Sequence, residues 1–267
     1  MFGVESEFGM RKLKSIFLTL FDAITLDRIT SMDITPQDNE ILAFEPVEIL
    51  TLNDAVFLVS IANNKIDKSR LLVAHNVTLN GELGKIILLD TLQSVKPVHT
   101  EFYLVTDSAE SNLLVIQPLP FESFHNQKIR VKKFDHLLEQ NWHSSLELPY
   151  KDKNMHIEQL YFDGHHKFVL LARQIVGIPV DLPNQVKENN KYHVIGYNHE
   201  TEKLDEIELK LKDKWIRSLK LFANDDIIVI CGYYSNGNNQ EINGVFNLLL
   251  NSDYEITNAQ LQSINSS

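Results

Sequence analysis

A short polar loop followed by an apolar strand occurs four times along this chain at nearly constant spacing. The copies are TLNDAVFLVSI from Thr51, TDSAESNLLVIQ from Thr106, FDGHHKFVLLA from Phe162 and FANDDIIVICG from Phe222. Their apolar runs begin at Ala55, Leu113, Phe168 and Ile227, so the steps are 58, 55 and 59 residues. A fixed period of this size is typical of repeat architectures, in which each copy is one supersecondary unit.

The third copy shows the pattern of strands most clearly. We expect four strands there, at residues 168–172, 191–198, 204–211 and 215–222. In 204–211, Ile207 and Leu209 alternate with Glu206 and Glu208, which indicates a half-exposed antiparallel strand. The first strand is apolar on both faces, so both of its faces must be buried. These features predict an all-β fold with propeller-like, four-stranded antiparallel blades, in which this first strand is innermost.

Internal matches support equivalent strands in successive copies. Leu146 and Leu148 match Ile207 and Leu209 at an offset of 61 residues, and Asp135 matches Asn198 at an offset of 63. A looser match pairs Ile86 and Leu88 with Leu146 and Leu148 at an offset of 60.

The last copy is shorter than the others, which sets the expected number of blades. We count three full blades and part of a fourth, and we expect a repeat domain over 55–257, N-terminal strands and a connector over 1–54, and a polar tail over 258–267. Propellers close with about four to eight blades. Either the N-terminal strands complete a small ring, or the ring is incomplete in this chain, and we favour the second alternative.

Three segments carry a resemblance to known proteins. They are LELPYKD from Leu146, LKLKDKWI from Leu209, and GYYS from Gly232 followed by INGVF from Ile242. In these segments the chain resembles a group of uncharacterised bacterial β-propeller-like proteins. The resemblance covers most of the chain and concerns blade strands and turns only. That group has no assigned activity, so the resemblance implies a fold and favours an exported protein, but it implies no functional residues.

The charge and cysteine content exclude several classes of function. The formal net charge of −11 argues against nucleic-acid binding and against docking on an anionic membrane. No apolar run approaches the ~20 residues of a membrane helix. Cys231, the only cysteine, excludes an intrachain disulfide and is expected to be a buried, inert thiol. A cytoplasmic location fits this chain, and export stays open if a signal lies outside it.

The sequence contains one candidate metal-binding feature, a set of acidic residues in turns. No nucleophile elbow, P-loop or zinc motif is present, and the ten histidines show no ligand spacing. Acidic residues precede the expected inner strands, and a propeller would gather them at one mouth of the ring; they are Asp54, Glu110, Asp163, Asp225 and Asp226. Carboxylates so placed are ligands for calcium, and Asp163, Asp225 and Asp226 are the candidates, although tight turns need the same residue types.

Two long loops on the opposite face are unexpectedly apolar. The loop PLPFESFHNQ contains Phe121 and Phe124, and QIVGIPVDLPNQVKENN contains Ile178, Val180 and Leu182. Such side chains either mark a binding site for a protein or peptide, or fold back between blades. We expect a non-catalytic binding or scaffold module that uses these loops. The alternative is a hydrolase-type or metal-binding propeller with its site at the acidic turns.

Overall fold

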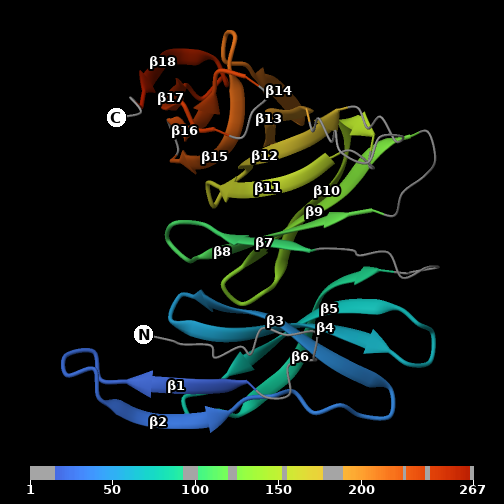
Figure 1. The fold of residues 1–267 in the computed structure, drawn as a ribbon. Coiled ribbons are helices and arrows are strands. Elements are labelled where there is room, and N and C mark those ends of the chain that lie inside the picture. Colours follow the sequence, from blue (N-terminus) through green and yellow to red (C-terminus); the bar gives the residue numbers. More distant parts are fainter. Residues whose placement is uncertain are drawn as a thin grey trace, which may run out of the picture. The chain divides into compact units, whose positions relative to one another are not determined.

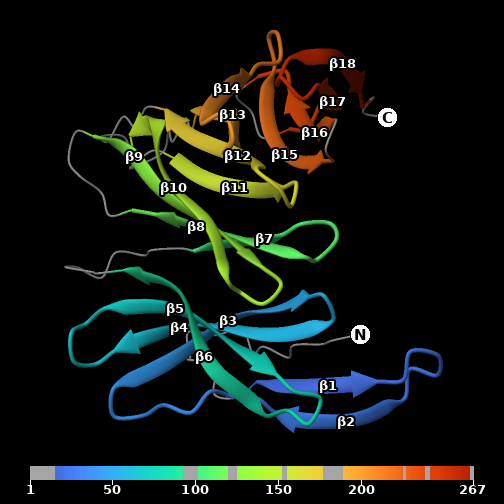
Figure 2. The ribbon, with the colours of Figure 1, turned by 180° about the vertical axis from the view of Figure 1, so that it is seen from behind.

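The computed structural model describes residues 16–92, 102–119, 125–151, 155–176, 189–224, 227–237 and 241–264. Within these ranges all regular structure is β, and the strands form four four-stranded antiparallel sheets and one two-stranded sheet (Figure 1). Each large sheet is a meander whose strands follow one another in chain order (Figure 2). The propeller-like, all-β fold is thus confirmed.

The strands divide among the sheets as follows. The two-stranded sheet contains β1 (Phe17–Phe21) and β2 (Arg28–Asp33). The first large sheet contains β3 (Leu42–Leu52), β4 (Ala55–Asn64), β5 (Arg70–Val77) and β6 (Leu83–Leu92). The second contains β7 (Tyr103–Thr106), β8 (Asn112–Pro118), β9 (Asn126–Asp135) and β10 (Gln140–Lys151). The third contains β11 (Met155–Phe162), β12 (Lys167–Val176), β13 (Asn189–Asn198) and β14 (Lys203–Leu209). The fourth contains β15 (Trp215–Ala223), β16 (Ile228–Ser235), β17 (Gly244–Leu250) and β18 (Ile256–Ser263).

The sheets begin one strand earlier than the sequence pattern predicted. The apolar strands at Ala55, Leu113, Phe168 and Ile227 fall in the second strand of each sheet, not the first. The strand expected at 215–222 therefore opens the fourth sheet rather than closing the third. A strand that is apolar on both faces is buried on both faces, and a strand in the middle of a sheet meets this condition. The apolar run therefore does not show that a strand is the first or innermost one.

The expected boundaries of the repeat domain, residues 55 and 257, differ from the structure at both ends, because a strand beyond each boundary belongs to a four-stranded sheet. The strand β3, placed within 1–54, is hydrogen-bonded to β4 and belongs to the first large sheet. The expected polar tail from Asn258 is instead most of β18, which completes the fourth sheet by pairing with β17. The count of three blades and a part is wrong, because four sheets have all four strands. That the ring is incomplete in this chain stays a prediction.

Internal matches hold for the fourth strands of the second and third sheets. Leu148 in β10 and Leu209 in β14 are both buried, as their alignment requires. The looser match fails in β6, where Leu88 is 55% exposed although Leu148 is fully buried. The pairing of β5 with β6 shifts register twice, and Leu89 takes the buried place. A shift of one residue moves a side chain to the other face of a strand.

A bulge recurs in the first strand of three sheets. The extra residues are Val47 in β3, Glu158 in β11 and Arg217 in β15, and the last two are 59 residues apart. Bulges redirect side chains and increase strand twist. At two of these bulges the extra residue makes a polar contact. Nε of Arg173 lies 2.5 Å from a carboxylate oxygen of Glu158, and Nε of Arg217 donates to the hydroxyl of Ser235 at 2.7 Å.

The chain divides into two compact units. The first comprises Met1–Thr100, Ala109–Leu113 and Lys133–Asn141, and the second comprises Glu101–Ser108, Leu114–Lys132 and Trp142–Ser267. In the first unit, Ile16, Leu18 and Ile34 of the β1–β2 segment pack with Leu58 and Val77 of the first large sheet.

In the second unit, apolar side chains of neighbouring sheets pack face to face. Phe168, Leu170 and Ile195 of the third sheet pack against the second, and Val169, Leu171 and Val194 pack against the fourth. The alternation of consecutive residues between the two faces means that both faces of the third sheet are buried.

Candidate functional site

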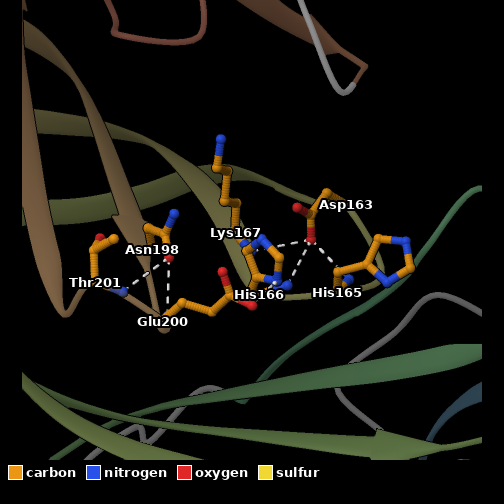
Figure 3. A network of polar contacts seen from close by, with 7 residues as sticks. All are labelled: Asp163, His165, His166, Lys167, Asn198, Glu200 and Thr201. Carbon is orange, nitrogen blue, oxygen red and sulfur yellow. Dashed lines mark hydrogen bonds and ion pairs between the residues drawn. The ribbon is translucent and has the colours of Figure 1, made fainter.

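The β11–β12 turn of the third sheet holds the described acidic candidate, Asp163. One oxygen of its carboxylate accepts hydrogen bonds from the backbone N–H groups of His165, His166 and Lys167, at 2.8, 3.0 and 3.0 Å (Figure 3). Gly164 follows with a φ of +84°, and a Cβ there would lie 2.4 Å from a carboxylate oxygen of Asp107. Asp163 therefore closes its own turn, because that oxygen already accepts three donors.

Among the described residues, two pairs of neighbouring turns approach each other. In the first unit, the N–H of Asn53 donates to the carbonyl of Glu110 at 2.8 Å, and in the second unit Gly164 approaches Asp107. No three His, Cys, Asp or Glu side chains in the described ranges lie close enough together to hold a metal ion. Asp225 and Asp226 lie outside the described residues, so a calcium site stays a prediction.

Beside this turn lies the start of the β13–β14 connection. The carboxylate of Glu200 is 3.3 Å from Nδ1 of His166, and the side chain of Asn198 accepts the N–H groups of Glu200 and Thr201 (Figure 3). The imidazole of His165 points away from Glu200 in the same view. The adjacent histidines therefore diverge, as expected for neighbours in a turn.

A serine and a histidine meet between the second and third sheets. The hydroxyl of Ser144 in β10 is 3.2 Å from Nδ1 of His199 and 3.2 Å from the hydroxyl of Tyr197. The indole of Trp142 stacks on His199, with ring centres 4.2 Å apart and planes 10° from parallel. A serine beside an imidazole is one element of nucleophilic catalysis, which also needs a group to orient the imidazole. No carboxylate is seen hydrogen-bonded to His199 among the described residues.

A second histidine, His193, is buried between the same two sheets. Its Nδ1 lies 2.6 Å from the hydroxyl of Tyr150 and 3.0 Å from the carboxylate of Glu206, while its Nε2 has no hydrogen-bond partner among the described residues. Burial lowers the pKa of His193 to about 4, and raises the pKa of Glu206 with a further contribution from Glu208. Both shifts favour a neutral imidazole beside Glu206.

The outer face of the fourth sheet, which points away from the third sheet, is hollowed. We call this open depression the fourth-sheet hollow. Its volume is about 970 Å³, and its lining includes Lys220, Phe222, Cys231, Tyr233, Asn247 and Gln260. Phe222 is 61% exposed and Tyr233 is 45% exposed. The buried thiol expected at Cys231 is wrong, because the residue is partly exposed. Leu221 and Ile230 fill the inner face, so Lys220 and Cys231 must point outward.

The sequence placed the binding surface elsewhere. Phe121, Phe124, Ile178, Val180 and Leu182 all lie outside the described residues. The sequence does not reveal the fourth-sheet hollow, because the polar composition of 258–267 predicts a tail instead of a strand. A signal was present: Asn258, Ala259, Gln260, Leu261 and Gln262 alternate polar and apolar, as a strand does. The pairs Ser144–His199 and Tyr150–His193 join residues of different sheets, and no local pattern predicts them.

No helix that is long and apolar enough to span a bilayer occurs in the described ranges. No family model matches the sequence. No curated protein matches it either.

Solved structures with a similar backbone share little sequence identity with this chain. Cobalt-substituted ACO from Synechocystis has 9% identity and a TM-score of 0.47, over 93% of this chain and 57% of that one. The β-propeller domain of the trilobed protease from Pyrococcus furiosus has 9% identity and a TM-score of 0.43, over 95% of this chain and 75% of that one. Prolyl oligopeptidase B from Galerina marginata has 12% identity and a TM-score of 0.45, over 99% of this chain and 33% of that one.

This chain thus spans little more than half of the length of the ACO structures it resembles. The comparisons describe a likeness of backbone and carry no activity over to this chain. Its description as a protein of propeller-like blades rests on its own four sheets.

Proposed function

We propose that this chain is a non-catalytic protein-binding or scaffold module and that the fourth-sheet hollow is its binding surface. The observation that carries this proposal is the exposure of Phe222 and Tyr233 in a hollow of about 970 Å³. Large aromatic side chains gathered in an exposed depression are typical of interaction sites.

The lining of the hollow has the composition of an interface. Lys220 is the one charged side chain among the described residues that line the hollow, although the whole chain carries 61 charged residues, 25 Lys and Arg and 36 Asp and Glu. Depletion of charge with retention of aromatic residues distinguishes the centres of protein interfaces from other surfaces.

The third sheet supplies a comparison within the same protein. Its equivalent face, with Val169, Leu171 and Val194, is covered by the fourth sheet. The outer face of the fourth sheet is built on the same meander and carries Val229, Val245 and Leu249 beside the aromatic residues. A protein segment laid on this face would bury apolar surface as the fourth sheet does on the third.

Selection of peptides tests the proposal. A displayed library of extended peptides is selected on the wild-type protein, and the enriched peptides are then titrated against Phe222→Asp and against Leu79→Asp as a control. Leu79 is an exposed leucine in the β5–β6 turn, distant in sequence from the hollow. We expect Phe222→Asp to weaken binding at least about tenfold, because a buried unpaired charge costs more than 1.4 kcal/mol. Equal binding by both variants contradicts the proposed surface.

The long loops remain the second predicted surface for the same function. The double variant Ile178→Asp/Leu182→Asp, titrated with the same peptides, assigns binding to the loops if it alone loses affinity.

A second candidate function is hydrolysis, and the contact of Ser144 with His199 at 3.2 Å is the observation that favours it. A fluorophosphonate reagent reports an activated serine directly. Labelling of the wild type that is absent in Ser144→Ala and in His199→Gln would support hydrolysis, and unlabelled wild-type protein would contradict it.

A further inference from the structure

The exposed edge of the fourth sheet is the strand β18. All eight of its residues, Ile256–Ser263, are exposed, and none of them is charged or a proline. Edge strands usually carry charges, prolines or bulges that prevent pairing with another chain. Every other edge strand of the four-stranded sheets that has more than four residues does carry charges or a proline. The strand β14, for example, carries Lys203, Asp205, Glu206 and Glu208.

The sequence of this edge is nearly symmetric in chemical type. Residues 256–264 read Ile-Thr-Asn-Ala-Gln-Leu-Gln-Ser-Ile, with Gln260 at the centre. Reading outward from Gln260, Ala is opposite Leu, Asn opposite Gln, Thr opposite Ser, and Ile opposite Ile. When two copies of this strand pair antiparallel about Gln260, each apolar side chain faces an apolar one and each polar side chain faces a polar one. A two-fold symmetric contact needs a self-complementary surface, and in this register no polar side chain faces an apolar one and no charges face each other.

The backbone of β18 permits this register. The N–H of Ile264 donates to the carbonyl of Asn243 at 2.9 Å, and β18 pairs with β17 without a shift from Ser263 to Asn258. Successive residues of a strand direct their backbone groups alternately to the two sides. Ala259, Leu261 and Ser263 therefore direct their N–H and C=O groups outward. Pairing about Gln260 sets Ala259 opposite Leu261 of the second copy. Because the backbone N–H and C=O groups of both residues point outward, the two copies can exchange hydrogen bonds there.

The side chains add an amide row across the contact. Lys220, Cys231, Asn247 and Gln260 are cross-strand neighbours from β15 to β18. The side-chain N–H of Asn247 donates to Oε1 of Gln260 at 3.4 Å. Two Gln260 side chains facing each other continue this row into the second copy, and cross-strand amide pairs are favourable neighbours.

We propose that two copies of this chain associate by antiparallel pairing of their β18 strands about Gln260, which joins two four-stranded sheets into one. The occupant is a second copy because the edge is self-complementary and free of charge in a chain of net charge −11. Like charges repel two copies at any charged edge. This inference rests on the proposed function, because both take the fourth sheet as the binding element. It adds that the partner is a second copy of the chain.

Charge variants at the centre test the pairing. We expect the wild type to show a concentration-dependent dimer by sedimentation equilibrium. Gln260→Lys and Gln260→Glu should each weaken dimerisation at least about tenfold, because like charges meet directly across the two-fold axis. An equimolar mixture of the two variants should dimerise again, because Lys then faces Glu. Recovery in the mixture shows that both variants are folded.

A backbone variant and a control complete the experiment. Ala259→Pro removes an outward N–H without removing a bond to β17, so we expect a folded monomer by circular dichroism and sedimentation. Gln140→Lys changes an exposed glutamine of another edge strand, β10, and should leave dimerisation unchanged.

The outcomes separate this inference from the proposed function. A wild type that stays monomeric at its highest soluble concentration overturns the pairing, as does a dimer that Gln260→Lys does not weaken. Peptide binding that depends on Phe222 would still hold in either case. Conversely, dimers that respond to Gln260 while no peptide is enriched support the pairing and reject the hollow as a peptide site.

Discussion

The phenol of Tyr254 occupies the space that a side chain at Gly196 would take. A Cβ on Gly196 would lie 1.8 Å from Cζ of Tyr254 and 2.0 Å from its hydroxyl oxygen. Gly196 is in β13 of the third sheet, and Tyr254 is in the β17–β18 turn of the fourth. Burial raises the pKa of Tyr254 to about 12, with nearby carboxylates of Asp205, Asp163 and Asp253 adding to the shift. A neutral phenol thus joins the two sheets.

The contact predicts that Gly196→Ala destabilises the protein. We expect a loss of about 2–3 kcal/mol in the free energy of unfolding by urea, because the ring must leave a closely packed site. In a Tyr254→Ala background the same substitution should cost much less, since the clash is removed. Gly84→Ala, whose Cβ would meet Asn76 at 3.3 Å, serves as the control. Equal costs in both backgrounds would show that Tyr254 is not the cause.

Asp163 is predicted to stabilise its own turn. Asp163→Ala removes the acceptor of three backbone hydrogen bonds, so we expect a loss of about 1–2 kcal/mol of stability. Asp163→Asn keeps a side-chain oxygen and should cost less. A calcium-dependent rise in melting temperature in the wild type that Asp163→Ala lacks would support the predicted calcium site, and equal shifts in both proteins would contradict it.

His193 is predicted to make the protein less stable in mild acid. Its pKa lies near 4 in the folded protein and near 6.5 in the unfolded chain, so the unfolded chain binds the extra proton first. Stability is therefore full above about pH 6.5 and falls towards pH 4, by about 2 kcal/mol at pH 5. Glu206 acts oppositely, because its pKa is raised in the folded state and its protonation stabilises that state at lower pH.

Urea unfolding at pH 7.5, 6 and 5 measures this effect. His193→Gln should flatten the pH dependence, and His143→Gln, which removes an exposed histidine, should preserve it. Burial also lowers the pKa of His75, so His75→Gln should remove a further part of the slope. A wild type equally stable from pH 7.5 to pH 5 would contradict the assignment.

Cys231 is predicted to react with thiol reagents in the folded protein, because it is partly exposed in the fourth-sheet hollow. A bulky maleimide there should abolish binding of the selected peptides, while the small reagent methyl methanethiolsulfonate should weaken it less. Mass spectrometry under native conditions measures the modification. A thiol that reacts only after unfolding would restore the buried assignment.

The sequence by itself determined the fold class and much of the local structure. The recurrence of apolar runs at Ala55, Leu113, Phe168 and Ile227 is a hydrophobic periodicity, which is local, so it located the second strand of each four-stranded sheet. Turn chemistry is local too: Asp135 and Asn251 both accept backbone N–H groups within their own turns.

Only the tertiary structure decided where each sheet begins and which residues meet. A meander of alternating strands has no local mark for its first strand, and hydrogen-bond pairing assigned β3 and β18 to their sheets. The contacts of His193 with Tyr150 and of Tyr254 with Gly196 join residues 43 and 58 positions apart. Such contacts depend on how one sheet packs on the next, which periodicity within a strand does not encode.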